Sequence, residues 1–162
     1  TLLGIGSELA GGVRNIYMTN CEASGKVHRL FFVKTNHRRG AFVEHVYMDS
    51  IRTKGTLRVA EIDTDVLYQW RDLVPTYKDT LTRINDIYLS NIEVDSANAI
   101  YEFRGDERLP IRNVVLRNIA VDCVKDTVNR AVNVEALKVD NVTYNSVSSE
   151  ILSDIDMFLG NK

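Results

Sequence analysis

Cysteine is scarce in this sequence, with only Cys21 and Cys123 among 162 residues, which excludes a disulfide framework and a cysteine-rich metal site. Two prolines and nine glycines are too few for a low-complexity chain. The formal net charge of −2 does not indicate the excess of basic residues that is typical of nucleic-acid-binding proteins. No apolar run approaches the roughly 20 residues that a membrane span needs. The 44% of hydrophobic residues suffices for one core, so we expect a single domain over 1–162.

A nine-residue motif recurs along the chain. Each copy has an aliphatic residue in the first place and Asn, Asp or His in the third. An aliphatic residue follows in the fourth place, a large apolar residue in the sixth, Asn or Ser in the eighth and an apolar residue in the ninth. The copies occupy 13–21, 43–51, 84–92, 111–119 and, more weakly, 139–147. Their starts lie 27 to 41 residues apart, and repeats of this length are typical of solenoids.

The pattern inside the motif favours strands over helices. Apolar fourth and sixth places alternate with polar or exposed ones, which is the period of a strand. β-branched residues dominate the apolar places, as pleated surfaces prefer. Asn or Ser in the eighth place suits a corner with left-handed backbone, and such side chains can form a polar ladder between turns. A leucine-rich repeat is the alternative, but its short period and regular leucines are missing.

A second strand follows the motif in each turn. These strands are predicted at 30–35, 57–62, 99–103 and 131–134, and 2–7 has the pattern of the same strand in a preceding turn. We therefore expect an all-β solenoid that starts in the middle of a coil and is truncated on its N-terminal side. The segment 66–82 is predicted to be an inserted loop, and 148–162 a C-terminal capping segment.

Several segments between the copies resemble those of one enzyme family. They are Gly-Ser-Glu at 6–8, Gly-Gly-Val-x-Asn at 11–15, Phe-Val-Lys-Thr at 32–35, Arg-Arg-Gly-Ala-Phe-Val-Glu at 38–44 and Pro-Ile-Arg-Asn-Val at 110–114. Their order and spacing resemble the polygalacturonases of glycoside hydrolase family 28, most strongly over residues 3 to 52. The resemblance implies a right-handed parallel β-helix that hydrolyses α-1,4-galacturonosyl linkages of pectin with inversion. It also implies an extracellular or periplasmic location and no cofactor.

The catalytic motifs of that family have no counterpart in this chain. The family's catalytic aspartates and histidine lie upstream of its Gly-Ser-Glu segment, whereas Asp63 and Asp65 lie downstream of it. An inverting hydrolase needs a general acid and a general base on opposite sides of the bond. We therefore expect the catalytic residues to lie outside this fragment, and these 162 residues not to cleave polygalacturonate alone.

The candidate binding residues come from the family's Arg-x-Lys segment and the basic loop after it. Lys34 matches the lysine that binds substrate carboxylates, whereas Phe32 replaces the arginine. Strand alternation predicts that Phe32 and Lys34 both point outward. Aligning 56–60 beneath 30–34 places Arg58 under Phe32, where it would supply the missing guanidinium. The other candidates are His37, Arg38 and Arg39.

Alternatives stay open for these residues. Phe32 either presents its ring to a sugar or lies covered by the aromatic side chains of the insertion, and Arg58 is either a ligand or a solvated arginine. The chain as a whole is an enzyme fragment that binds an acidic polysaccharide or oligogalacturonide, a non-catalytic binding module, or a structural solenoid. The basic set of Lys34, Arg38, Arg39 and Arg58 favours the first two.

Overall fold

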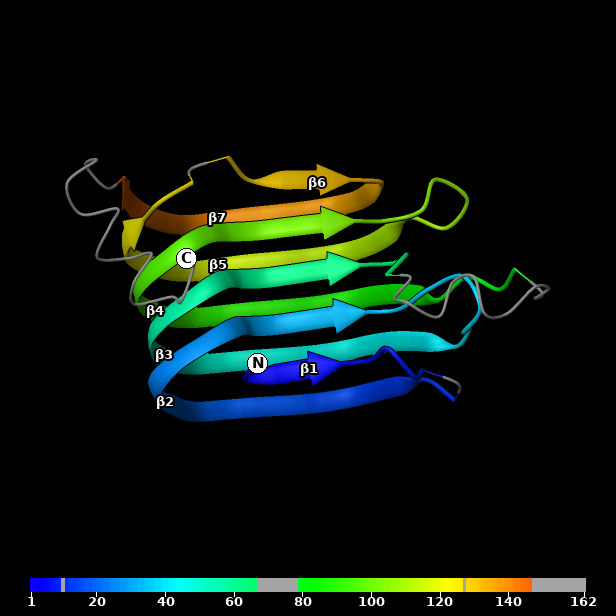
Figure 1. Ribbon diagram of the computed structural model, residues 1–162, viewed down its shortest axis with the longest axis horizontal. Helices are drawn as coiled ribbons and strands as arrows, with labels where there is room; N and C mark the ends of the chain where they lie inside the picture. Colours follow the sequence, from blue (N-terminus) through cyan, green and yellow to red (C-terminus); the bar gives the residue numbers. More distant parts are fainter. Residues whose placement is uncertain (10, 67–78, 127, 147–162) are drawn as a thin grey trace.

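A computed structural model describes residues 1–9, 11–66, 79–126 and 128–146. All regular secondary structure in these residues is β-strand (Figure 1). The strands are β1 (Leu3–Ile5), β2 (Val13–Lys34), β3 (Phe42–Asp63), β4 (Arg83–Arg104), β5 (Ile111–Val124), β6 (Arg130–Val132) and β7 (Val134–Ser146). They form one parallel sheet in the order β1-β2-β3-β4-β5-β7, with β6 paired to β4. The all-β, parallel part of the sequence prediction is confirmed.

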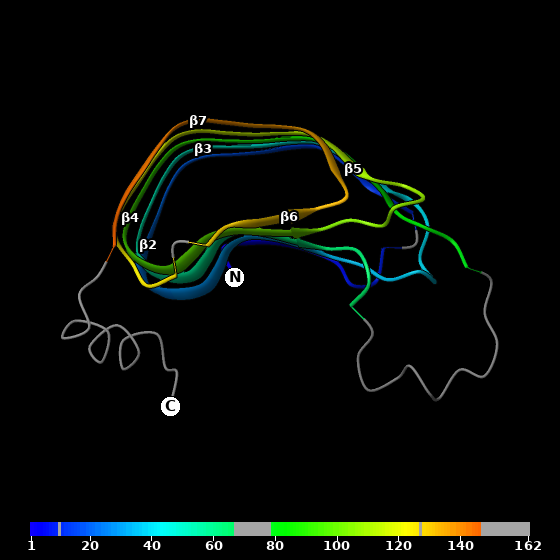
Figure 2. The same ribbon diagram turned by 90° about the horizontal axis from the view of Figure 1, so that it is seen from above.

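The long strands lie over one another and bend at shared places, as Figure 2 shows from above. The first four motif copies are aligned across them, because Val13 pairs with Val43, Val43 with Ile84, and Asn85 with Arg112. The third and eighth places have positive φ in every one of these copies, at Asn15, Asn20, His45, Ser50, Asp86, Asn91, Asn113 and Asn118. Asn and Asp tolerate this conformation better than other side chains, so the motif is a pair of corners.

The fifth copy was predicted five residues too late. Ile111 pairs with Val134, which makes 134–142 the true copy, with Ala136 third and Asn141 eighth. Both residues have positive φ. The prediction was wrong because Asn141 satisfies the third place as well as the eighth, while alanine at 136 breaks the pattern that marks the third place elsewhere.

Eighth-place side chains of three copies form the predicted polar ladder, which ends on Asp49 in the seventh place of its copy. Asn141 Nδ2 donates to Asn118 Oδ1 at 2.9 Å, and Asn118 Nδ2 donates to Asn91 Oδ1 at 3.0 Å. Asn91 Nδ2 continues the ladder to Asp49 Oδ1 at 2.7 Å. The amides of Asn91 and Asn118 both donate and accept, so the ladder joins four turns of the sheet along one corner.

Replacing Asn118 with alanine is expected to lower the free energy of unfolding by about 1–2 kcal/mol. The change removes two ladder hydrogen bonds. It also leaves alanine at φ 52°, where it has no polar side chain whose hydrogen bonds offset the strain of the left-handed backbone. Urea unfolding measures the loss. Asn118→Gly is the matched control, because glycine accepts the backbone conformation without strain and isolates the ladder contribution. Wild-type stability in both variants would show that this corner contributes nothing.

The core lies on the inward faces of the strands. Val43, Val46 and Met48 of β3 are fully buried, and Ile84 and Leu89 of β4 are 1% exposed. The part of the chain that the structure describes has no helix long and apolar enough to cross a membrane. Residues 67–78, which make up most of the predicted insertion, and the predicted cap at 148–162 lie outside the described residues.

Candidate functional site

The ends of β2, β3 and β4 carry the first group of candidate residues. Phe31 and Val33 are fully buried, whereas Phe32 and Lys34, which alternate with them along β2, are partly exposed. The alternation confirms the prediction that Phe32 and Lys34 point outward. The Phe32 ring lies beside two cations, with the Arg29 guanidinium carbon 5.1 Å and Lys34 Nζ 5.9 Å from its centroid. These distances allow cation–π attraction on the outer surface.

Arg58 does not lie under Phe32, so that placement was wrong. Phe32 pairs with Glu61, and Arg58 pairs with Arg29. The first halves of β2 and β3 are offset by 30 residues, as in Val13 with Val43, and one extra residue between Ala23 and Lys26 reduces the offset to 29. The alignment used an offset of 26, which matched the wrong pair of apolar residues.

Arg58 instead belongs to a chain of ion pairs across three strands. Glu61 accepts from Arg29 Nε at 2.7 Å and from Arg58 at 3.2 Å. Arg58 also pairs with Glu102 at 2.7 Å, and Arg104 bonds Glu102. Burial alone would raise the pKa of Glu102, but the hydrogen bond from Arg104 and the charge of Arg58 lower it overall. The Glu102 carboxylate is therefore held in its ionised form.

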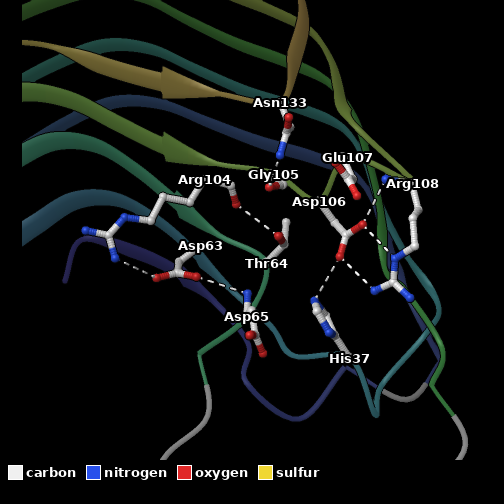
Figure 3. Close-up of a pocket in the computed structure, with 10 residues that line it drawn as sticks. All are labelled: His37, Asp63, Thr64, Asp65, Arg104, Gly105, Asp106, Glu107, Arg108 and Asn133. Carbon is white, nitrogen blue, oxygen red and sulfur yellow. Dashed lines mark hydrogen bonds and ion pairs between the residues drawn. The ribbon is translucent and has the colours of Figure 1, made fainter.

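A polar pocket of about 650 Å³ opens where the same strands end. Its walls come from four successive turns, and Figure 3 shows the side chains that face it. They are His37, Asp63, Thr64, Asp65, Arg104, Gly105, Asp106, Glu107, Arg108 and Asn133. Lys34 pairs with Asp63, and Asp63 with Arg104, so the pocket continues the outward row that holds Lys34.

His37 and Asp106 join two loops across the pocket. His37 Nε2 lies 3.2 Å from Asp106 Oδ2, and Arg108 Nε donates to Asp106 Oδ1 at 2.9 Å (Figure 3). The hydrogen bonds from Arg108 are the main cause that lowers the pKa of Asp106 to about 2. The histidine ring is therefore held beside an ionised carboxylate and a cation.

Asp63 is shifted in the opposite direction from Asp106. Burial raises the pKa of Asp63. Two weaker effects oppose it, the charge of Arg104 and a 3.0 Å hydrogen bond that the backbone N–H of Asp65 donates to Asp63. A pocket lined by carboxylates beside the guanidinium groups of Arg104 and Arg108 offers both hydrogen-bond acceptors and donors. Such a surface suits a polar ligand with several hydroxyl groups.

The structure brings only some of the predicted residues together. His37 lines the pocket and Lys34 borders it, whereas Arg39 forms an ion pair with Glu8 of the preceding loop. The backbone N–H of Arg38 donates to Asn36 Oδ1 at 3.0 Å. Sequence reasoning missed Asp106 and Arg104 as pocket residues. The signal for Arg104 was its place in the same outward row as Lys34, two turns on.

Acid titration tests the role of Asp106. Because its folded pKa is about 2, below the ordinary 3.8, its stabilising effect is complete above that ordinary value and is lost as the pH falls from about 4 to 2. Asp106→Asn is therefore expected to flatten the fall in urea midpoint over this pH range. Asp122→Asn, at an exposed carboxylate of β5, is the matched control. An unchanged slope in Asp106→Asn would contradict the assignment.

The comparisons with known proteins add no family. A scan against protein-family models and a search of curated proteins each returned no match for this chain. In the part of the chain that the structure describes, no group of three or more His, Cys, Asp or Glu side chains is arranged to hold a metal ion. The functional assignment therefore depends on the motifs and on the geometry around Lys34.

Proposed function

We propose that the chain is part of a polygalacturonase-like glycoside hydrolase with a right-handed parallel β-helix. In the intact protein it would hydrolyse α-1,4-galacturonosyl linkages of pectin by an inverting mechanism, outside the cytoplasm. The described strands and their order are compatible with such a coil. The residues of this chain would bind the acidic saccharide, and the catalytic pair would come from other parts of the intact protein.

The observation that carries the proposal is the position of Lys34 beside the pocket. Its strand partner Asp63 lines the pocket, and its ammonium group lies near the outward ring of Phe32. An ammonium group gives a charge-assisted bond to a uronate carboxylate, while an aromatic ring suits the apolar face of a sugar. We assign substrate binding to this pair and to His37, which lines the pocket. Arg38, Arg39 and Arg58 do not line it and stay candidates from the sequence.

A purely structural solenoid is the second candidate, and two observations favour it. The guanidinium group of Arg58 is engaged by Glu61 and Glu102. Two glycines of the family-like segments at 6–8 and 11–15 also have a folding role. Gly6 has φ 108°, and a Cβ there would overlap the carbonyl oxygen of Lys34. At Gly12, with φ 85°, a Cβ would lie 2.7 Å from the Phe42 ring. These glycines are thus explained by the turns alone.

A binding titration separates the two candidates. The 162-residue chain is titrated with trigalacturonate and with maltotriose, a neutral trisaccharide of equal length, by calorimetry and amide NMR shifts. We expect saturable binding of the acidic trisaccharide only. Lys34→Ala should weaken that binding roughly ten-fold, because the substitution removes one charge-assisted hydrogen bond. No release of reducing ends is expected from polygalacturonate.

The control for that titration is Lys54→Ala, because Lys54 is an exposed lysine of β3 outside the pocket. Its affinity should equal that of the wild type. Equal binding of both trisaccharides, or no binding of either, would favour the structural solenoid. Release of reducing ends by the chain alone would contradict the assignment of catalysis to other parts of the intact protein.

A further inference from the structure

The described residues that line the pocket carry more negative than positive charge. Apart from the imidazole of His37, their charged groups are four carboxylates and two guanidinium groups. These belong to Asp63, Asp65, Asp106 and Glu107 and to Arg104 and Arg108. A ligand anion placed in this space therefore meets an excess of charge of its own sign.

Both guanidinium groups are already bonded to carboxylates of the chain. Arg108 donates to Asp106 Oδ1 at 2.9 Å and to Asp106 Oδ2 at 2.8 Å, and it also bonds Asp79. Arg104 bonds Glu102, which lies two residues before it on β4. Asp79 and Glu102 are not among the lining residues, so part of the charge of the two arginines is neutralised from outside the pocket.

Glu107 adds a carboxylate to the pocket that these arginines do not bind. It is exposed, and it makes no hydrogen bond or ion pair with any residue that the structure describes. Figure 3 shows it beside Asp106 and Arg108, with no interaction drawn to either. A substitution at Glu107 therefore changes the charge of the pocket without breaking a bond to another described residue.

Asp63 shows how this environment acts on a carboxyl group. Burial is the main cause that raises its pKa, and the negative charges of Glu61 and Asp65 add to the rise. The positive charge of Arg104 acts the other way but does not reverse the shift. Desolvation and like charges thus disfavour the ionised form of a carboxyl group at this pocket.

We propose that the pocket accepts a uronate unit whose carboxyl group is methyl-esterified, while Lys34 beside it binds the ionised carboxylate of a neighbouring unit. Because Lys34 binds a uronate carboxylate in the proposed function, on which this assignment rests, the substrate class narrows from polygalacturonate to partly esterified pectin. An ester has no charge for the lining to repel, and its carbonyl oxygen accepts hydrogen bonds from guanidinium N–H groups. Glu107 acts as a specificity-determining residue, because it repels an unesterified unit.

A comparison of two acidic trisaccharides tests the proposal. The 162-residue chain is titrated by calorimetry with trigalacturonate and with the dimethyl ester of trigalacturonate, which keeps one ionised carboxylate. At low ionic strength the diester should bind roughly five-fold more tightly, because it places no like charge in the pocket. The difference should shrink as salt is added, since screening weakens repulsion between groups that water reaches.

Glu107→Gln tests whether the pocket causes this preference. The substitution should strengthen the binding of trigalacturonate about three-fold and leave that of the diester unchanged, because only the unesterified unit meets the charge that is removed. Asp122→Asn is the matched control, since Asp122 is an exposed carboxylate of β5 outside the pocket. It removes one negative charge from the chain and should bind both trisaccharides like the wild type.

Each result decides between the esterified unit and the proposed function. A preference for the diester that narrows in Glu107→Gln alone supports the esterified unit. Diester binding that is equal to or weaker than that of trigalacturonate overturns the esterified unit and leaves saccharide binding in place. An unchanged preference in Glu107→Gln, or the same narrowing in Asp122→Asn, overturns the assignment of the repulsion to this pocket. No binding of either trisaccharide overturns the proposed function and the esterified unit with it.

Discussion

Replacing Phe31 with alanine is expected to lower the free energy of unfolding by about 3–5 kcal/mol. Phe31 is fully buried and is among the largest side chains of the core. It pairs with Leu3 of β1 on one side and Ala60 of β3 on the other, so its ring fills space between turns. The facing Ala60 has no side chain long enough to fill the cavity left by the phenylalanine ring. Urea unfolding should therefore show both the lost burial of the ring and the cost of an unfilled cavity.

Phe32→Ala is the matched control for this prediction. The two phenylalanines are adjacent, but the Phe32 ring lies on the outer surface between Arg29 and Lys34. Its loss should cost no more than about 1 kcal/mol, the scale of an exposed cation–π contact. If the two variants lose equal stability, the inward and outward assignment on this strand is wrong, and with it the place of Lys34 beside the pocket.

Most of the fold could be predicted because local chemistry repeats at the corners. Asn15, Asp86 and Asn113 mark third places through a backbone conformation that few side chains accept. The prediction went wrong where this mark is missing, at Ala136. It also went wrong at Arg58, because apolar residues recur often enough for an offset of 26 to match as well as the true offset of 29.

The site was harder to predict than the fold. The outward direction of Lys34 follows from strand alternation, so it could be predicted from the sequence. The pocket depends on segments from four turns, and His37 meets Asp106 across 69 positions of sequence. Nothing in the local pattern around either residue indicates the other, because loop contacts follow from the stacking of turns and not from a period within a strand.

Replacing Arg58 with alanine is expected to destabilise the fold by about 2 kcal/mol, whatever its effect on saccharide binding. Arg58 joins Glu61 to Glu102 and is 29% exposed, while Glu102 is 7% exposed. Without Arg58 the two carboxylates keep only Arg29 and Arg104 as partners and repel each other in a poorly hydrated place. The expected loss lies below that of a fully buried pair because the guanidinium is still reached by water.

Arg52→Ala shows whether the loss comes from burial or from charge alone. Arg52 pairs with Glu93 at 2.6 Å, but the two side chains are 57% and 66% exposed, so at most about 1 kcal/mol should be lost.

The effect of Arg58→Ala should also shrink with acid. Because the pKa of Glu102 is lowered, the stabilisation that its partners provide is present above the ordinary value of 4.5 and is lost as the pH falls through the folded value. Urea midpoints of both variants at neutral and acidic pH measure this, and equal losses at neutral pH would mean that Arg58 is only a solvated surface arginine.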